Sequence, residues 1–381
     1  MRHHGTDGVR AGRRALQAIA GRWQSTSNAK KSAAVSRVRG TRDLLPDELE
    51  QHISVVRTLQ DAVQRYGFRQ IQTPLLEYTD LFCCSLGDGS DIVMKEMYTF
   101  EDNSGKSVTL RPEGTAGVVR ALVSNSLMYS LPQKLSYTGS MFRYERPQRG
   151  RYREFQQFGA EYIGSAGPSV DVEVIAMAAD ALAALGIKEN IRLEMNSLGD
   201  TESRARYRVA LENYFEQYKC ELSTDSQNRL ERGSVLRILD SKSESDQQIV
   251  AEAPQLDQYL SEDAAARFDM VVGGLEALGI DYRLNSRLVR GLVILSCYAG
   301  LRIELLTNAF VEKNDDGSSG IAVLAGGCYD SLVDTLGGPA TSCIGWAAGL
   351  DRLCLLRNQP SIGPSTISVC SALMVTVECA L

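Results

Sequence analysis

The spacing of apolar residues along the chain predicts an order of helices and strands. A stripe at helical spacing, ending at Gly67, is formed by Leu49, Ile53, Val56, Leu59 and Val63. Asp47 followed by Glu50 is typical of a capping box at the start of this helix. Further helices are predicted at 116–129 and 170–185, and strands at 68–74, 107–110, 190–196 and 321–327. Helices and strands are therefore mixed along the chain.

The segment from Tyr137 to Gly164 has the alternation of two strands joined by a loop. Side chains that would share a face are Arg143 and Glu145 on the first strand, and Phe155, Gln157 and Glu161 on the second. Charged groups on one face are poorly suited to a core and well suited to binding a phosphate and an amine. The loop adds four arginines that no carboxylate within it balances before Glu154, namely Arg146, Arg149, Arg151 and Arg153. An alternative is a solvated hairpin whose charges only keep it soluble.

The composition is that of a soluble globular protein. With 381 residues and 41.7 kDa, the chain can bury a large core and divide into two folding units. Hydrophobic residues make up 44% and charged residues 23%, and no apolar run approaches the roughly 18 residues of a membrane helix. The nine cysteines lack the spacing of a metal site, so we expect reduced thiols, no metal site and no membrane partner.

Charge is unevenly distributed between the first 39 residues and the rest. These residues carry nine arginines and lysines against Asp7 alone, a formal charge of +8, whereas the whole chain carries −6. Leu16, Ile19 and Trp23 recur there at helical spacing. A basic, acid-poor segment of this kind is typical of a transit peptide. We therefore expect residues 1–38 to direct the protein to the mitochondrion, with the plastid or the cytoplasm as alternatives. A basic arm that contacts RNA is another interpretation.

The hairpin has the sequence F-R-x-E, then R-P, a basic loop and F-x-Q-F-G-x-E. This sequence resembles motif 2 of class II aminoacyl-tRNA synthetases, in the form found in histidyl-tRNA synthetases. The ATP-binding residues that the resemblance implies are Arg143 on the α-phosphate, Glu145 on the adenine amino group, Phe155 stacked on the ring, and Arg151. The residues implied to contact histidine are Gln157 and Glu161. Gln156 replaces a histidine of the family, on the opposite face of the strand.

Three shorter sequence segments resemble other motifs of the same family. RGTRDLLP and the helix, strand and proline that follow resemble its opening and its motif 1, which forms the dimer interface. RPEGTAG resembles the amino-acid loop and implies that Glu113 and Thr115 bind the α-ammonium group, with an ordinary helix cap as the alternative. TSCIGWAAGLDRLCLL resembles motif 3 and implies that Arg352 binds the γ-phosphate. A buried ion pair of Arg352 with Asp351 or Glu378 is the alternative.

The order of these phrases implies an α+β fold. The family has an antiparallel sheet flanked by helices, with a helical insertion between motifs 2 and 3. The catalytic domain would then occupy residues 39–196 and 285–356, and the insertion residues 197–284, which are polar and poor in aromatic side chains. Residues 357–381 are too few for the family's anticodon-binding domain. We therefore expect the chain to lack that domain and to end in a truncated or aberrant tail.

Two phrases depart from the family pattern. The family's histidine-binding phrase is R-G-L-D-Y-Y, and here Arg290 begins it, but residues 293–295 are Val, Ile and Leu. Counting back from Glu304 instead puts Tyr298 at the second tyrosine. Arg290 is thus a candidate catalytic residue at the α-phosphate, and Tyr298 a candidate histidine-binding residue. In the second phrase, G-G-R-Y-D, Cys328 replaces the arginine.

The resemblance implies a reaction in two steps. ATP and histidine would give histidyl-adenylate and pyrophosphate, and the histidyl group would then pass to tRNA(His). The implied catalytic residues are Arg143, Arg290 and Arg352, and the implied partners are histidine, ATP with Mg²⁺, tRNA(His) and a second copy in a homodimer. One alternative is a non-catalytic synthetase-like subunit that regulates ATP phosphoribosyltransferase. Another is an inactive product of an altered transcript.

Overall fold

The structure is a computed structural model that describes residues 35–87, 90, 92–148, 150–241, 243–286, 288, 300–307 and 321–358. It divides into two compact units, residues 1–39 and 40–381. All elements named below belong to the second unit. The expectations for residues 1–38 and 357–381 fall almost entirely outside the described residues, and those for Arg290 and Tyr298 fall wholly outside them.

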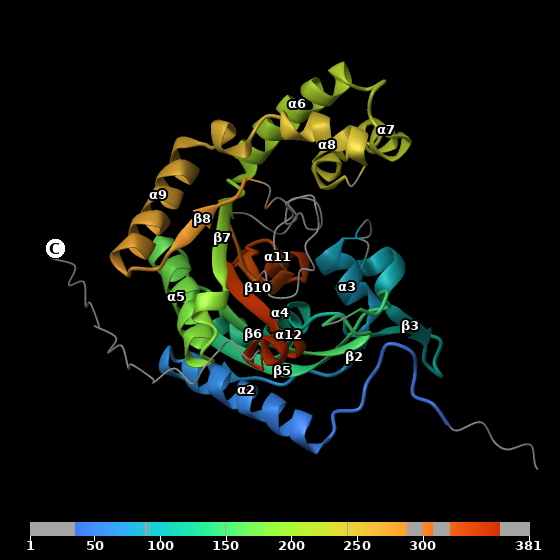
Figure 1. Cartoon of the computed structure of the whole chain (residues 1–381), viewed down its shortest axis with the longest axis vertical. Coiled ribbons are helices and arrows are strands. Elements are labelled where there is room, and N and C mark those ends of the chain that lie inside the picture. Colours follow the sequence, from blue (N-terminus) through green and yellow to red (C-terminus); the bar gives the residue numbers. More distant parts are fainter. Residues whose placement is uncertain are drawn as a thin grey trace, which may run out of the picture. The chain divides into compact units, whose positions relative to one another are not determined.

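An eight-stranded sheet runs through the second unit (Figure 1). Its strands in spatial order are β1 (Arg69–Gln70), β5 (Gln133–Phe142), β6 (Glu154–Ile163), β11 (Cys343–Gly349), β10 (Ile321–Cys328), β9 (Leu301–Thr307), β7 (Arg192–Ser197) and β8 (Tyr282–Leu284). The inner strands pair antiparallel, whereas the described edge strands β1 and β8 each pair parallel with their neighbour. The predicted antiparallel sheet flanked by helices is confirmed, and its edges make it a mixed sheet.

A smaller sheet precedes the hairpin in the chain. It has the order β2 (Leu76–Tyr78), β4 (Ser107–Leu110) and β3 (Tyr98–Glu101). Helix α3 (Thr79–Leu86) follows β2, and a π-helical turn occupies Ile92–Glu96. Strand β4 leads into helix α4 (Thr115–Ser124) and a 3-10 turn at Leu127–Ser130. Helix α4 is shorter than predicted because Ser126, with a left-handed φ of 58°, cannot continue it.

Different helices cover the two faces of the main sheet. On one face, α2 (Pro46–Arg65), α5 (Pro168–Ala184) and α12 (Leu350–Arg357) share an apolar core with β6, β7, β9, β10 and β11. On the other face, α4 and α11 (Leu332–Thr335) pack with Tyr137 and Met141 of β5. Because strand residues alternate, Phe158 and Ala160 face the first core, and Phe155 and Ile163 face the second.

Helix α2 differs from its prediction in its start and in its buried face. It begins at Pro46, and its N-cap residue Leu45 makes no side-chain cap, so the predicted capping box is wrong. Proline at the first position starts the helix instead. Leu49 and Ile53 of the predicted stripe are 44% and 41% exposed. The buried residues are His52, Val55, Leu59, Ala62 and Val63. The helix therefore carries apolar side chains on two sides.

Helices also lie in the segment between β7 and β8. They are α6 (Thr201–Gln217), α7 (Thr224–Glu231), α8 (Glu244–Ala251) and α9 (Glu262–Ala277), with 3-10 turns at Val235–Asp240 and Leu256–Tyr259. This segment buries an apolar cluster of its own around Leu211 and Phe215. Helix α9 packs against α5, where Arg267 pairs at 2.8 Å with Asp171. The residue numbers given above for the domain boundaries stay a prediction.

None of the helices in the described residues is long and apolar enough to cross a membrane.

We expect Arg267→Ala to lower the free energy of unfolding by about 1–3 kcal/mol, because it leaves the buried Asp171 carboxylate without its ionic partner. The change is measured as a shift of the urea unfolding midpoint. Arg206→Ala is the matched control, since it breaks the exposed pair with Glu202 within α6, which is worth about 0.3–0.5 kcal/mol. Equal shifts in the two variants would show that the contact between α9 and α5 is no stronger than a surface pair.

Candidate active site

Strand β6 carries three side chains that form the floor of the candidate site. Phe155, Gln157 and Glu161 share one face of β6, as the alternation predicted. Register fixes their place, since Gln157 lies opposite Gly139 of β5 and Gly349 of β11. The space that Gly139 leaves is filled by the guanidinium of Arg111, which a Cβ atom at that position would overlap.

Glu161 is the most deeply buried carboxylate of this floor. It is 1% exposed, and its oxygens accept hydrogen bonds from the hydroxyls of Tyr329 at 2.5 Å and Thr115 at 2.7 Å. Burial raises the pKa of Glu161 to about 8, against the opposing effect of these two donors. A Cβ atom at Gly345 of the adjacent strand would overlap the carboxylate. Glycine at this position therefore makes room for a buried acid.

Glu113 lies beside this acid, at the start of α4. Its two oxygens accept from the backbone N–H groups of Thr115 at 2.6 Å and Ala116 at 3.0 Å. The helix-cap interpretation is therefore confirmed for Glu113. Burial raises the pKa of Glu113, and the capping N–H groups oppose that rise. A carboxylate has about four acceptor sites, so a cap leaves capacity for a further donor.

Gln157 provides the clearest sign of a missing partner. Its side chain is 9% exposed, and Oε1 is buried with no hydrogen-bond partner in the part of the chain that the structure describes. A buried carbonyl oxygen without a donor costs about 1–3 kcal/mol. The position on the floor between Phe155 and Glu161 therefore favours a ligand that donates a hydrogen bond to it.

Arg143 lies directly after β5 and faces the same side. Its Nε donates to the backbone oxygen of Pro112 at 2.9 Å. Its guanidinium carbon lies 5.3 Å from the centre of the Phe155 ring, within range of a cation–π contact. Arg143 is 4.0 Å from the carboxylate of Glu145, so these two side chains are together as predicted. Among the residues that the structure describes, the other donors of this guanidinium make no hydrogen bond shorter than the 4.0 Å ion pair, so they can bind an anion.

Arg352 approaches the hairpin loop from α12. Its guanidinium donates to the backbone oxygens of Gly150 at 3.1 Å and Ala322 at 2.5 Å. Burial, Arg151 and Arg143 together lower the pKa of Arg352. The ion pair with Asp351 considered above is wrong, because Asp351 accepts from other groups; Glu378 lies outside the described residues. The structure thus brings three arginines to one place, where their mutual repulsion favours an anion.

The loop of the hairpin is better balanced than the sequence indicated. Arg151 pairs at 2.9 Å with Glu145, the carboxylate that precedes the loop. The guanidinium carbon of Arg153 lies 3.7 Å from the centre of the Tyr144 ring, and its Nε donates to the backbone oxygen of Glu145 at 3.2 Å. The carboxylate that pairs with Arg151 thus comes from outside the loop. Arg149 lies outside the described residues.

Sequence reasoning missed two tyrosines of the site. Tyr329 donates to Glu161, and Tyr137 is a hydrogen-bond partner that lowers the pKa of the same acid. Tyr137 lies across Gly159, where a Cβ atom would overlap its ring. The signals available were Gly159 in F-x-Q-F-G and the tyrosine after Cys328. The Cys328 thiol lies 3.6 Å from Asp171, whose charge Arg267 balances.

Known proteins are similar to the chain over most of its length. The model of the histidyl-tRNA synthetase family matches residues 40–353. Histidine–tRNA ligases of Gluconacetobacter diazotrophicus and Rhodospirillum rubrum are each 49% identical to the chain, over 87% of it and 77% of their own length.

Solved structures are similar as well. The crystal structure of apo S. aureus histidyl-tRNA synthetase has a TM-score of 0.68 and 34% identity, covering 87% of this chain and 75% of that one. An ATP phosphoribosyltransferase regulatory subunit/histidyl-tRNA synthetase from Bacillus halodurans has a TM-score of 0.62 at 24% identity, covering 86% and 85%, which shows likeness of fold alone. Since the family match spans most of the chain and the relatives reach 49% identity, the chain belongs to the histidyl-tRNA synthetase family.

Proposed function

We propose that this protein is a histidine–tRNA ligase that joins histidine and ATP into histidyl-adenylate and then transfers the histidyl group to tRNA(His). One observation carries the proposal. Three guanidinium groups, of Arg143, Arg151 and Arg352, lie beside a floor on which the buried Oε1 of Gln157 has no partner among the described residues. The arginines thus favour an anion, and the neighbouring Gln157 favours a hydrogen-bond donor. ATP and an amino acid supply them.

The triphosphate is proposed to lie among the arginines. Arg143 would bind the α-phosphate and Arg352 the γ-phosphate, with Arg151 beside them. Burial lowers the pKa of Arg352, and the nearby Arg151 and Arg143 lower it further, so an anion between these groups would be stabilised by all three. Guanidinium groups bind phosphate oxygens in pairs of parallel hydrogen bonds. These donors are held before the substrate arrives, which is how a charged transition state is stabilised without reorganisation.

Adenine is proposed to stack on Phe155. The Phe155 ring already has Arg143 over one face, so a purine base would complete a stack at this end of the site. Glu145 would accept from the adenine amino group. Its carboxylate is held by Arg151 at 2.9 Å, which fixes the direction in which its remaining acceptor sites point.

Histidine is proposed to lie over Gln157 and Glu161. Its α-ammonium group would lie near Glu113 and Thr115, and its imidazole would donate to Gln157. A cation beside Glu161 lowers the pKa of that acid from its raised value and favours the carboxylate. The positive charge of the substrate would thus stabilise the ionised carboxylate, as water would if the group were exposed. Tyr298 and Arg290, the other proposed contacts, lie outside the described residues.

The first chemical step needs no covalent intermediate with the protein. The carboxylate of histidine attacks the α-phosphorus, the bond to the β-phosphate breaks, and pyrophosphate leaves. Holding both reactants in line supplies much of the rate, and Arg143 would stabilise the charge that grows on the α-phosphate. Within the described residues, no three His, Cys, Asp or Glu side chains form a metal cluster. We propose that Mg²⁺ enters as part of the MgATP substrate.

Three further proposals concern the setting of the reaction. The exposed apolar side chains Leu45, Leu49 and Ile53 of α2 and the residue before it favour a homodimer. The basic hairpin loop would meet the acceptor end of tRNA(His). The basic, acid-poor composition of residues 1–38 supports delivery to the mitochondrion.

We expect Arg143→Ala to lower histidine-dependent ATP–pyrophosphate exchange by about 10³-fold, since it removes a donor to the charge developing on the α-phosphate. Arg206→Ala, which removes an exposed arginine of α6, is expected to exchange at the wild-type rate. Undiminished exchange in Arg143→Ala would contradict the role. Wild-type protein that binds ATP without exchange would favour the regulatory alternative.

We expect Glu161→Gln to gain stability relative to the wild type as pH rises from about 5 to 8. Between the ordinary pKa and the raised value of about 8, the folded wild type binds more protons than the unfolded chain. Its free energy of unfolding therefore falls with pH, by at most about 1.4 kcal/mol per pH unit from this group. Urea titrations of both proteins at several pH values measure the difference. A difference that does not change with pH would mean that Glu161 titrates normally.

A further inference from the structure

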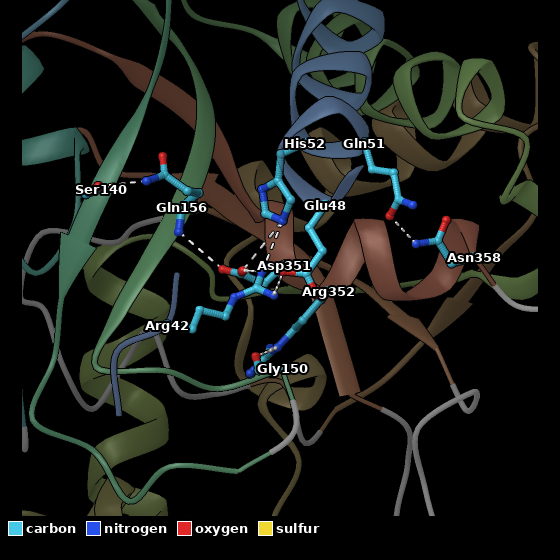
Figure 2. A network of polar contacts seen from close by, with 10 residues as sticks. All are labelled: Arg42, Glu48, Gln51, His52, Ser140, Gly150, Gln156, Asp351, Arg352 and Asn358. Carbon is cyan, nitrogen blue, oxygen red and sulfur yellow. Dashed lines mark hydrogen bonds and ion pairs between the residues drawn. The ribbon is translucent and has the colours of Figure 1, made fainter. Parts of the chain in front are cut away.

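A network of polar side chains joins the start of α12 to the segment before α2 and to strand β6 (Figure 2). At its centre is Asp351, in the first turn of α12 and 5% exposed. Its Oδ1 accepts from Nη2 of Arg42, and its Oδ2 accepts from the backbone N–H of Gln156 at 3.2 Å. The next residue after Asp351 is Arg352, and the residues on either side of Gln156 are Phe155 and Gln157. Asp351 thus joins the two elements that carry the proposed ATP contacts.

The contact with Gln156 continues the sheet beyond the end of a strand. Strand β11 ends at Gly349, which lies opposite Gln157 of β6. One residue earlier in β6, the N–H of Gln156 bonds to the Asp351 carboxylate instead of a strand partner. The Gln156 side chain is held as well, because it donates to Ser140 of β5 at 2.7 Å. The strand can therefore shift against α12 only by giving up a charge-assisted hydrogen bond.

Arg42 supplies the charge that balances Asp351. Its guanidinium also contacts Nε2 of His52 at 3.0 Å and lies 4.7 Å from the centre of the Tyr152 ring. For His52 to accept from a guanidinium, its ring has to be neutral with the proton on Nδ1. Burial lowers the pKa of His52, which agrees with the neutral ring. Arg42 is therefore held on three sides, by the carboxylate, the imidazole and the aromatic ring.

The same N-terminal segment is tied to the hairpin that bears Arg143. The backbone N–H of Arg153 donates to the oxygen of Gly40 at 2.8 Å, and the oxygen of Arg153 accepts from the N–H of Arg143 at 2.9 Å. Gly40 has φ of 89°, and a Cβ atom there would overlap the Arg153 side chain. A path of direct contacts thus leads from Asp351 through Arg42 to the backbone of Arg143.

We propose that Asp351, held by Arg42, is a positioning residue that fixes the spacing between the triphosphate arginines and the adenine-binding strand. This positioning role rests on the proposed function, in which Arg352, Arg143 and Phe155 contact ATP. Asp351 and Arg42 act through these residues and do not touch ATP themselves. The proposed position of histidine is over Gln157 and over Glu161, and Glu161 is held by Tyr329 and Thr115 rather than by Asp351 or Arg42. The role is therefore specific to ATP.

The test uses full-length protein and compares Asp351→Asn with the wild type in histidine-dependent ATP–pyrophosphate exchange. Asparagine keeps the shape and one oxygen but removes the charge that orders Arg42 and Gln156. We expect the KM for ATP to rise about 10–100-fold, as for a small misplacement of a reactant, and the KM for histidine to stay within about twofold. We expect Arg42→Gln to raise the KM for ATP to a similar extent, and Arg42→Lys to raise it less. The double variant Asp351→Asn with Arg42→Gln is expected to have a KM for ATP close to that of either single variant.

A control breaks a different contact close to α12. Asn358, after α12, donates to Gln51 of α2 at 2.6 Å on the exposed side (Figure 2). Gln51→Ala removes that bond and is expected to leave both KM values unchanged. Three results would overturn the proposal: an unchanged KM for ATP in Asp351→Asn, an equal rise in both KM values with a lower Tm, or an equal effect of Gln51→Ala.

Calorimetric titration with MgATP separates this proposal from the proposed function. If the wild type binds ATP but shows no exchange, the ligase assignment fails, and a weaker Kd for ATP in Asp351→Asn than in Gln51→Ala still supports the positioning role. Equal Kd values in that case overturn it. If the wild type binds no ATP, both proposals fail.

Discussion

The register of three antiparallel strands is the constraint on which the candidate site depends. Gln157 lies opposite Gly139 of β5 and Gly349 of β11, and side chains alternate along β6. Odd-numbered residues from 155 to 161 therefore meet the site, whereas the Gln156 side chain lies on the other face and donates to Ser140 of β5. A slip of one residue would exchange these faces completely. The contacts of Asp351 and Ser140 with Gln156 stabilise this register.

Glycines at two places allow large polar groups to lie flat on this sheet. Gly345 makes room for the Glu161 carboxylate, and Gly159 for the Tyr137 ring. Without those spaces the acid would be displaced toward water, and its pKa would return toward the ordinary range. Because burial makes Glu161 easy to protonate, binding of a ligand at the site is coupled to the ionisation of this acid. A bound ammonium group and an ionised Glu161 stabilise each other, so an uncharged analogue of the amino acid loses that contribution.

The local chemistry of the hairpin could be read from the sequence, because alternation and residue type determine which side chains share a face. Phe155, Gln157 and Glu161 are together for that reason. The buried face of helix α2 is harder to predict, because the helix has apolar residues on two sides and spacing alone does not tell which side meets the sheet. The pairing of Glu145 with Arg151 depends on how the loop folds back. The contact of Arg42 with Asp351 joins residues 309 positions apart, a separation at which no spacing rule applies.

The position of β11 has a consequence for how the chain reaches its folded state. Among the described strands it comes last in the sequence, yet it lies between β6 and β10. Until residues 343–349 are synthesised, strands β1, β5 and β6 cannot connect to β10, β9 and β7, and two open strand edges face solvent. Contacts such as that of Cys343 with Ile163 are far apart in the chain, so they raise contact order and slow folding. A nascent chain on the ribosome thus carries exposed edges of the kind that chaperones shield from aggregation.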